Sequence, residues 1–302
     1  MFMRLSYVVK KLKGGVVVDN FYKIVPQKKG HYRIASKEAI FMDLFVGKEK
    51  ALLLDTGYGY GNLRKQVRNI TDLDLIIINS HGHLDHTCGN FQFKEKIYIH
   101  EKDMELCKHH TNVEHRRRAV ECAKQSIDDG ETIKENILPK EFDEKAYINS
   151  GSGNLVPVKE GKQFQLGGIT LNVYEFPGHT SGSIGLFWEE EKILFVGDAI
   201  NPCLWLFLPE ALTLADYKMT LQKTYAIDFT HFYMSHSLEK TEKKVILEYM
   251  DAAEHLDYEK GIPCETPLAP GILARMCPRE GFSLHDNGKP GFACIVISEE
   301  HL

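Results

Sequence analysis

The segment "LIIINSHGHLDH" at residues 75–86 constrains this chain most, because three histidines and an aspartate directly follow an apolar run. The β-branched residues and short length of "LIIIN" predict a buried strand. His81 and His83 alternate across the following loop, so both imidazoles can reach one ion, while Asp85 and His86 can serve a neighbouring ion. We therefore expect a metal-binding loop at the end of a buried strand.

One loop cannot complete two metal sites, so further ligands must come from distant segments. Three candidates sit where predicted strands end: His179 in "FPGHTSGS", Asp198 in "FVGDA" and His236 in "YMSHS". Taken singly, His179 suits a turn, Asp198 a cap and His236 a half-buried strand end. In the company of the histidine loop, the ligand interpretation is favoured for all three.

A weak internal repeat supports this grouping. "KALLLDTG", a helix and "LDLIIINSH" parallel "KILFVGDA", a helix and "THFYMSH". In both halves a buried strand ends in Asp, a helix follows, and a second buried strand ends in His. Polar residues at strand C-termini point into the crevice where ligands bind in α/β folds. We expect the polar strand ends of both halves to meet at one edge.

The order of these motifs resembles the metallo-β-lactamase superfamily over about residues 15–240. An Asp-Thr-Gly turn, H-x-H-x-D-H after a buried strand, a Gly-His-Thr turn, a Gly-Asp and a late strand-end His follow one another, and five motifs in order are a specific signal. The resemblance implies an α/β fold, a four-layer αββα sandwich in a single domain over residues 1–302. It also implies a dinuclear metal centre at one edge of that sandwich.

The resemblance also implies a role for each candidate residue. His81, His83 and His179 would hold the first metal, Asp85, His86 and His236 the second, and Asp198 would bridge them. Asp55 in "LLLDTG" would orient the histidine loop by hydrogen bonds rather than bind metal. Two divalent ions, zinc or else iron or manganese, would hold a bridging hydroxide as nucleophile. Asp85 or Asp198 would act catalytically by passing a proton to the leaving group.

Two regions fall outside the repeated halves. Residues 101–150 predict charged helices inserted beside the mouth of the site, where they would shape the substrate pocket or a homodimer contact; a solvated excursion is the alternative. His109, His110 and His115 in this insert are interpreted as a solvated helix face. Residues 262–302 form a tail that ends in a predicted strand, "FACIVIS".

Composition bounds the partners and the compartment. The formal net charge is −5 over 302 residues, which gives no overall field to recruit nucleic acid or an anionic membrane. No stretch approaches the roughly 20 apolar residues that span a bilayer, and no signal peptide is recognised. The seven cysteines are scattered, which favours reduced thiols in a cytoplasm. A small-molecule substrate is the expected partner.

The substrate class is the last expectation. Leu204, Trp205 and Phe207 follow Asp198 and could line an apolar pocket, or they could simply be core. The motif loops contain no Lys or Arg to match a phosphodiester, so we expect hydrolysis of a small ester, thioester or lactone. The pattern is most similar to glyoxalase-II-like hydrolases, which cleave thioesters, although their basic glutathione-binding residues have no obvious equivalent here. A mononuclear iron oxygenase resembling persulfide dioxygenases, using His81, His179 and Asp198, and a phosphodiesterase remain alternatives.

Overall fold

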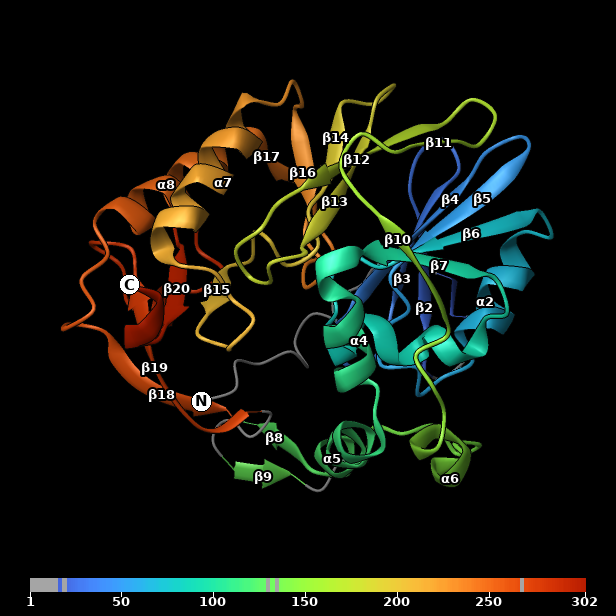
Figure 1. The fold of residues 1–302 in the computed structure, drawn as a ribbon, viewed down its shortest axis with the longest axis horizontal. Helices are drawn as coiled ribbons and strands as arrows, with labels where there is room; N and C mark the ends of the chain where they lie inside the picture. The colour runs from blue at the N-terminus through green and yellow to red at the C-terminus, as the bar shows by residue number, and fades with distance from the viewer. Residues whose placement is uncertain (1–15, 18–20, 129–130, 134–135, 267–268) are drawn as a thin grey trace.

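Two large β-sheets lie at the centre of the molecule, and helices cover their outer faces (Figure 1). The computed structural model describes residues 16–17, 21–128, 131–133, 136–266 and 269–302. Among these described residues, no helix combines the length and the apolar character needed to cross a membrane.

The first sheet has eight strands in the order β1-β2-β3-β4-β5-β6-β7-β10. It begins as an antiparallel meander and becomes parallel from β5 onward. Parallel neighbours need a crossover, which α2 (Leu63–Ile70) provides between β5 and β6, capped by Asn62 at its N-terminus. The strands are β1 (Val16–Val17), β2 (Lys23–Pro26), β3 (His31–Ala35), β4 (Phe41–Val46), β5 (Lys50–Leu54), β6 (Asp74–Ile78), β7 (Lys96–His100) and β10 (Asn154–Val158).

The second sheet has six strands in the order β11-β12-β13-β14-β16-β17. Only β14 and β16 run parallel to each other among its paired strands, and α7 (Leu214–Ala226) forms the crossover between them. α8 (Ile246–Glu254) follows β17 and packs beside α7. The strands are β11 (Gln163–Gln165), β12 (Thr170–Glu175), β13 (Ile184–Trp188), β14 (Ile193–Phe195), β16 (His231–Tyr233) and β17 (Thr241–Glu242).

Three apolar clusters define the layers. Phe45 and Leu52 of the first sheet pack with Leu186 and Phe195 of the second, so this cluster fills the space between the sheets. A second cluster joins the outer face of the first sheet to α2, α5 (Val113–Lys124) and α6 (Glu144–Ile148). A third joins the outer face of the second sheet to α7 and α8. The expected four-layer αββα sandwich is therefore confirmed.

The internal repeat is visible in the strand pairing. β5 and β6 run parallel and in register from Lys50 opposite Asp74, and β14 and β16 do the same from Ile193 opposite His231. Each pair is linked by a helix on the outside of its sheet, as the two halves of the repeat predict. The carboxyl ends of both pairs approach the same edge of the sandwich, because donors that follow β6, β14 and β16 come together there.

The insert at residues 101–150 contains the expected helices and a hairpin that the sequence did not indicate. The helices are α4 (Met104–His110), α5 and α6, preceded by the 3₁₀ turn η2 (Glu101–Asp103). The hairpin pairs β8 (Ser126–Asp128) with β9 (Glu131–Ile133). α4 lies directly against the short helix α3 (Leu84–Thr87) of the histidine loop, so the insert begins beside the site.

The tail forms a third sheet rather than a single strand. This sheet has the order β15-β20-β19-β18, and β20 is the strand that pairs with β15. Its strands are β15 (Cys203–Leu206), β18 (Ile262–Thr266), β19 (Ala269–Pro278) and β20 (Cys294–Ile297). β20 falls within the predicted "FACIVIS" strand, but β15 belongs to the segment interpreted as a pocket loop. The remaining 3₁₀ turns are η1 (Cys88–Gln92), η3 (Lys243–Val245), η4 (Leu284–Asp286) and η5 (Glu299–His301).

Candidate metal centre

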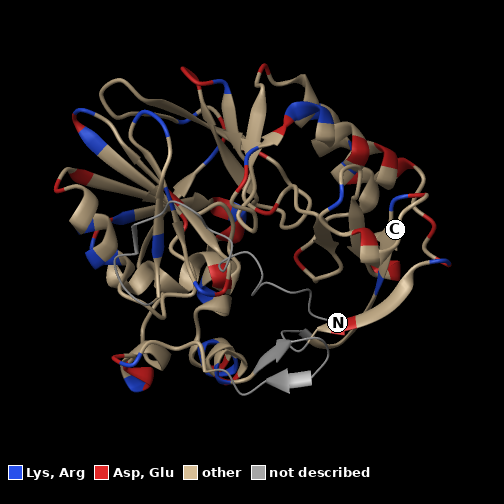
Figure 2. Ribbon diagram, turned by 180° about the vertical axis from the view of Figure 1, so that it is seen from behind, with Lys and Arg blue, Asp and Glu red and all other residues tan. Residues whose placement is uncertain are grey.

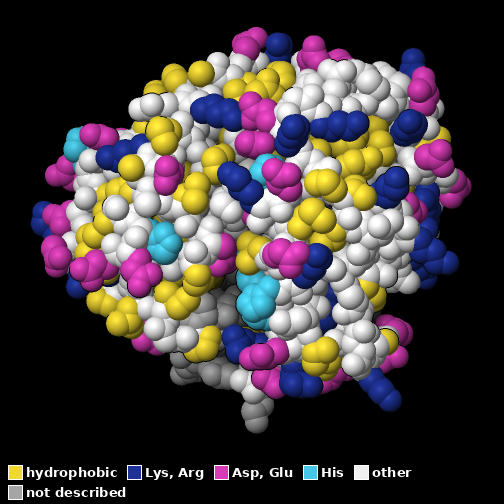
Figure 3. Space-filling view, in the orientation of Figure 1, with side chains coloured by type: hydrophobic (Ala, Val, Ile, Leu, Met, Phe, Trp, Pro, Cys, Tyr) yellow, Lys and Arg dark blue, Asp and Glu magenta, His cyan; other side chains and the backbone are white. Residues whose placement is uncertain are grey.

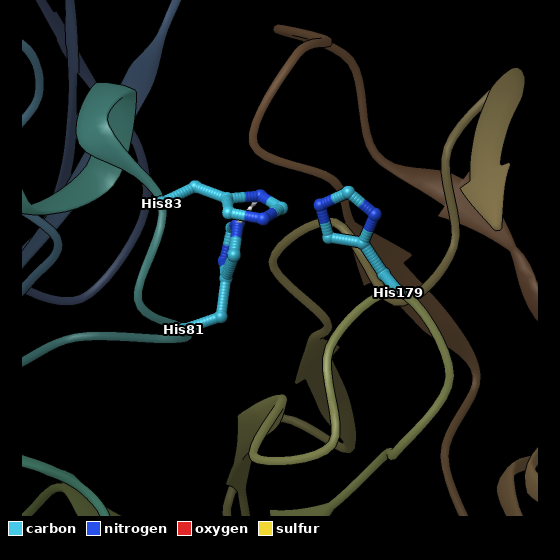
Figure 4. Close-up of side chains that lie close together, drawn as sticks. All are labelled: His81, His83 and His179. Carbon is cyan, nitrogen blue, oxygen red and sulfur yellow. Dashed lines mark hydrogen bonds between the residues drawn. The ribbon is translucent and has the colours of Figure 1, made fainter. Parts of the chain in front are cut away.

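Three histidines from two distant loops converge at the edge of the sandwich (Figure 4). His81 and His83 lie in the loop after β6, with His81 Nε2 3.1 Å from His83 Nδ1. His179 lies in the turn after β12, and its ring centroid is 4.9 Å from that of His81 and 4.6 Å from that of His83. One nitrogen of each ring lies within 4.8 Å of the others, which places three imidazole donors around a common point.

The hydrogen bond made by Nδ1 of His179 determines which of its two ring nitrogens carries the proton. Nδ1 lies 2.9 Å from the carbonyl oxygen of Trp205 and must donate to it, because a carbonyl only accepts. Nε2 is then the unprotonated nitrogen, and it is buried without a hydrogen-bond partner among the described residues. A histidine oriented through one nitrogen with the other free is the usual arrangement of a metal ligand.

Four further donors form a second group beside the first: Asp85, His86, Asp198 and His236. His236 Nε2 is 2.9 Å from Asp198 Oδ2, and His86 Nε2 is 3.6 Å from the same oxygen. His86 Nε2 and Asp198 Oδ1 are buried and, within the described part of the chain, make no hydrogen bond. Orphaned buried polar atoms are costly. Together with His179 Nε2, these two atoms fit the donor set of a metal centre.

Asp55 organises the histidine loop from beneath. Its Oδ1 accepts from the Ser80 amide at 2.7 Å, and its Oδ2 lies 2.8 Å from Ser80 Oγ and 2.9 Å from His86 Nδ1. Asp55 has φ +64°, a left-handed conformation that Asp tolerates better than most residues. It belongs to neither donor group. Its contacts are those of a side chain that orients ligands.

Asp103, at the start of the insert, joins the two loops of the first donor group, and sequence reasoning missed it. Its Oδ2 accepts from the Gly82 amide at 2.8 Å and from Thr180 Oγ1 at 2.7 Å, while Oδ1 accepts from the Gly182 amide at 2.8 Å. A Cβ at Gly182 would lie 2.4 Å from Asp103 Oδ1, so only glycine allows this approach. The one available signal was the glycine beside each ligand histidine loop.

Glu210 is a second residue that sequence reasoning missed. Its Oε1 lies 2.6 Å from Nε2 of His83, the nitrogen turned away from His81. Burial opposes ionisation of this carboxyl, but the hydrogen bond with His83 lowers the pKa of Glu210 to about 2. The segment that carries Glu210 is fastened to the His179 turn, because the Ser181 amide donates to Glu210 O at 3.2 Å. A carboxylate in this position increases the basicity of the opposite nitrogen of His83.

Arg33 holds the segment that carries His236. It is fully buried on β3 and pairs with Asp43, with Nε 3.0 Å from Asp43 Oδ1. Its guanidinium donates to the carbonyl of Met234 at 2.9 Å, to that of Leu238 at 3.0 Å, and to that of Ser237. These carbonyls flank His236 on both sides. The planar guanidinium suits this task because its five donors have a fixed geometry.

The interpretation of His110 as part of a solvated face is wrong. Its ring is half-buried and stacks on His83, with centroids 5.1 Å apart and planes 15° apart. Burial, followed by the neighbouring His83, lowers the pKa of His110 to about 3. His109 is exposed, as expected. A helical period predicts which residues share a face, but it does not reveal that a neighbouring loop covers that face.

The residues interpreted as a pocket lining have different positions. Leu204 is fully buried in the apolar cluster under α7 and α8. Phe207 is also buried, in the cluster between β15 and the tail, and Trp205 is half-buried with its ring 5.1 Å from that of Phe207. The structure thus places Leu204 and Phe207 in the core, and of Trp205 the carbonyl makes the described contact with His179.

The pKa values of the histidines shift in opposite directions in the two donor groups. Burial lowers the pKa of His179 to about 4 and that of His81 well below its usual value, so both are neutral at pH 7. Burial also disfavours charge on His86 and His236, yet the adjoining carboxylates raise the pKa of both. Neutral imidazoles bind metal directly, whereas protonated ones must first release a proton.

This arrangement defines a class of site: two adjoining groups of His and Asp donors at the edge of an αββα sandwich. Residues 43–246 match the family model of the metallo-beta-lactamase superfamily, and the chain belongs to this superfamily.

Two kinds of hydrolase are similar to this chain in sequence. The chain is 25% identical over 166 residues to acyl-coenzyme A thioesterase MBLAC2 from Homo sapiens, which covers 51% of this chain and 56% of that protein. It is 25% identical over 163 residues to hydroxyacylglutathione hydrolase GloC from Haemophilus influenzae, which covers 51% of this chain and 62% of that protein. The similarity therefore spans less than two thirds of either relative.

Solved structures show the same fold at lower identity. A metallo-beta-lactamase from Pontibacter korlensis superposes with a TM-score of 0.51 at 15% identity, over 80% of this chain and 99% of that one. The DIM-1 metallo-beta-lactamase gives a TM-score of 0.54 at 15% identity, over 78% of this chain and 99% of that one. At these identities the likeness establishes the fold alone.

Proposed function

We propose that this protein is a metal-dependent hydrolase that cleaves a small ester, thioester or lactone. A thioester is the best candidate. The observation that carries the proposal is the pair of donor groups with three orphaned buried atoms, His86 Nε2, His179 Nε2 and Asp198 Oδ1. These atoms suit two divalent ions, zinc or else iron or manganese. Ions bound there would acidify water to a pKa near 7 and polarise a carbonyl oxygen.

The residues around the donors favour a neutral electrophile over a phosphodiester. Beyond burial, the charged groups that chiefly shift the pKa of Asp85 are His86, His236 and Asp198, and those that shift the pKa of Asp198 are His236 and His86. Figure 2 shows basic residues interspersed with acidic ones over the outer helices and exposed strand ends. A phosphodiester carries permanent charge that proteins match with Lys or Arg. A carbonyl substrate needs no such match.

The two aspartates favour a good leaving group. Burial opposes their ionisation, but His86 beside Asp85 and His236 beside Asp198 hold the pKa of each carboxyl below its usual value. Carboxyl groups with a lowered pKa are ionised at neutral pH and have no proton to give to a leaving group. A thiol has a pKa of about 8.5 and leaves as thiolate with little help from a proton donor, unlike the more basic alkoxide. Two relatives named as an acyl-coenzyme A thioesterase and a hydroxyacylglutathione hydrolase support this choice.

Metal content is the first test. The protein should retain two ions per chain after dialysis, measured by inductively coupled plasma mass spectrometry, and Asp198→Ala should lose at least one. The circular dichroism spectrum of Asp198→Ala serves as the folding control. A wild type that holds one tightly bound iron and consumes oxygen with a persulfide would instead establish the mononuclear oxygenase.

Substrate preference is the second test. We expect kcat/KM to rank a short acyl-coenzyme A thioester above p-nitrophenyl acetate and a lactone, and all three above bis-p-nitrophenyl phosphate. A tenfold preference corresponds to about 1.4 kcal/mol of transition-state free energy. If the phosphodiester is preferred tenfold or more, the assignment to carbonyl chemistry is wrong.

A further inference from the structure

Three histidines of the insert gather beside the metal centre without belonging to either of its donor groups. His109 and His110 end α4, and His115 lies in the first turn of α5. Their ring centroids are 5.6 Å apart for His109 and His110, 4.5 Å for His109 and His115, and 5.0 Å for His110 and His115. One nitrogen of each ring lies within 4.8 Å of the others. Histidines are exposed together on this face of the molecule (Figure 3).

The nitrogens of this cluster are arranged as ligands. Nδ1 of His115 lies 3.2 Å from Oδ1 of Asn112, which also caps α5 by accepting from the His115 amide at 2.9 Å. An oxygen acceptor at Nδ1 leaves Nε2 of His115 unprotonated. Nδ1 of His110 is buried and, among the described residues, has no hydrogen-bond partner. The backbone turn at residues 111–112 holds the two helices so that the rings face one another.

The protonation states suit metal binding at neutral pH. Burial, and then the positive charges that His109 and Arg118 can carry, lowers the pKa of His115 below its usual value. A neutral imidazole keeps the lone pair that a metal needs. His109 is exposed and His115 half-exposed, so an ion can reach the cluster from solvent.

We propose that His109, His110 and His115 bind a third transition-metal ion, distinct from those of the catalytic centre. Three imidazoles with no carboxylate among them select zinc, copper or nickel rather than magnesium or calcium. Nitrogens of a tetrahedral zinc site lie ~3.4 Å apart, given Zn–N distances of about 2.0–2.1 Å. The present spacing therefore needs only rotamer adjustments of about 1 Å, and water would complete the coordination.

The position of this site gives it a physical link to the catalytic centre. His110 stacks on His83, so the proposed ion would be separated from the first donor group by this single pair of rings. Binding of this third ion would not depend on the substrate of the enzyme.

The test compares zinc stoichiometry between matched variants of the full chain. Wild type and the double variant His109→Gln/His115→Gln are dialysed against buffered free Zn²⁺ and measured by mass spectrometry. Wild type should bind one zinc per chain more than the double variant at saturation, and the two should retain equal amounts of tightly bound metal. His255→Gln, which replaces an exposed histidine at the end of α8, is the control and should match wild type.

A spectroscopic measurement identifies the ligands. Cu²⁺ added to zinc-loaded wild type should show nitrogen hyperfine structure in its electron paramagnetic resonance spectrum, and the double variant should lose it. If the double variant does not fold, His109→Gln alone should weaken binding of the extra zinc at least tenfold, because His109 is exposed and makes little contribution to stability. Equal zinc binding by wild type and the variants would overturn the proposal.

Discussion

Asp103 Oδ1 accepts a hydrogen bond of 2.8 Å from the backbone amide of Gly182, a residue 79 positions further along the chain. The same carboxylate accepts from the Gly82 amide, so one side chain sets the spacing between the loop of His81 and the turn of His179. The two loops belong to different sheets of the sandwich. Their relative position, and with it the first donor group, depends on a residue that belongs to neither donor group.

Asp103→Ala should therefore destabilise the protein by about 2 kcal/mol or more, because it leaves the buried Gly82 and Gly182 amides without an acceptor at ~1–3 kcal/mol each. The measurement is the free energy of unfolding from urea denaturation. Glu101→Ala replaces an exposed acid of the same 3₁₀ turn and should change stability by less than about 0.5 kcal/mol. An Asp103→Ala protein as stable as this control would contradict the bridging role.

Glu210→Gln should weaken metal binding without unfolding the protein. The substitution keeps the shape of the side chain but removes the charge facing His83, and loss of such outer partners costs roughly 10–100-fold in metal affinity. Competition with a chromophoric chelator measures the affinity. Glu141→Gln, at an exposed position of the insert, should behave as wild type. Unchanged affinity in Glu210→Gln would show that this contact has no influence on the ligand.

Arg33→Lys should selectively weaken binding of the second ion of the proposed dinuclear centre, the one that His236 would hold. A lysine cannot donate at once to Asp43 and to the carbonyls on both sides of His236, because it lacks the planar fork of arginine. We expect the metal content after dialysis to fall from two ions to one, and the stability to fall as well. Arg275→Lys is a matched control, since Arg275 also donates to two carbonyls, those of Glu259 and Gly261, each at 3.1 Å. Retention of both ions by Arg33→Lys would refute this prediction.

Glu38 should make stability depend on pH. Burial, opposed in part by Ser36, raises the pKa of Glu38 to about 7 from a reference value of 4.5. The unfolded chain loses this proton at lower pH than the folded one, so the contribution to stability is complete below about pH 4.5 and is lost as pH rises toward 7. Between pH 5 and 8 the loss should be roughly 2–3 kcal/mol.

Glu38→Gln should remove this component, so its advantage over wild type should appear at pH 8 and vanish at pH 5. Urea denaturation at both pH values measures it, and Glu49→Gln at an exposed position should follow wild type. Parallel pH profiles for wild type and Glu38→Gln would be inconsistent with a buried carboxyl that titrates late.

The fold could be predicted from local patterns in the sequence, and so could the choice of seven candidate donors, which the structure brings together in two groups. His81, His83, Asp85 and His86 lie in one short loop, and His179, Asp198 and His236 each follow a recognisable strand. Arg33, Asp103 and Glu210 act across long separations, largely through backbone amides and carbonyls or the far side of a ring. In the sequence these three residues look like any other charged residue, and no periodic pattern marks them as contacts of the site. The third sheet was missed because "CLWL", an apolar run of four residues that also suits a loop or ordinary core, was not recognised as the partner of the predicted strand that contains "CIVI".

The pairing of β15 with β20 affects when the candidate metal centre can form during synthesis of the chain. The carbonyl of Trp205 orients His179, and in its sheet of described strands β15 pairs only with β20, at residues 294–297. During translation the histidine loop is synthesised first and His179 about a hundred residues later. β20, which pairs with β15, follows about a hundred residues after His179. The nascent chain therefore exposes its first imidazoles well before it can hold the last one in place. We therefore expect firm binding of metal at this centre only after the tail has been translated.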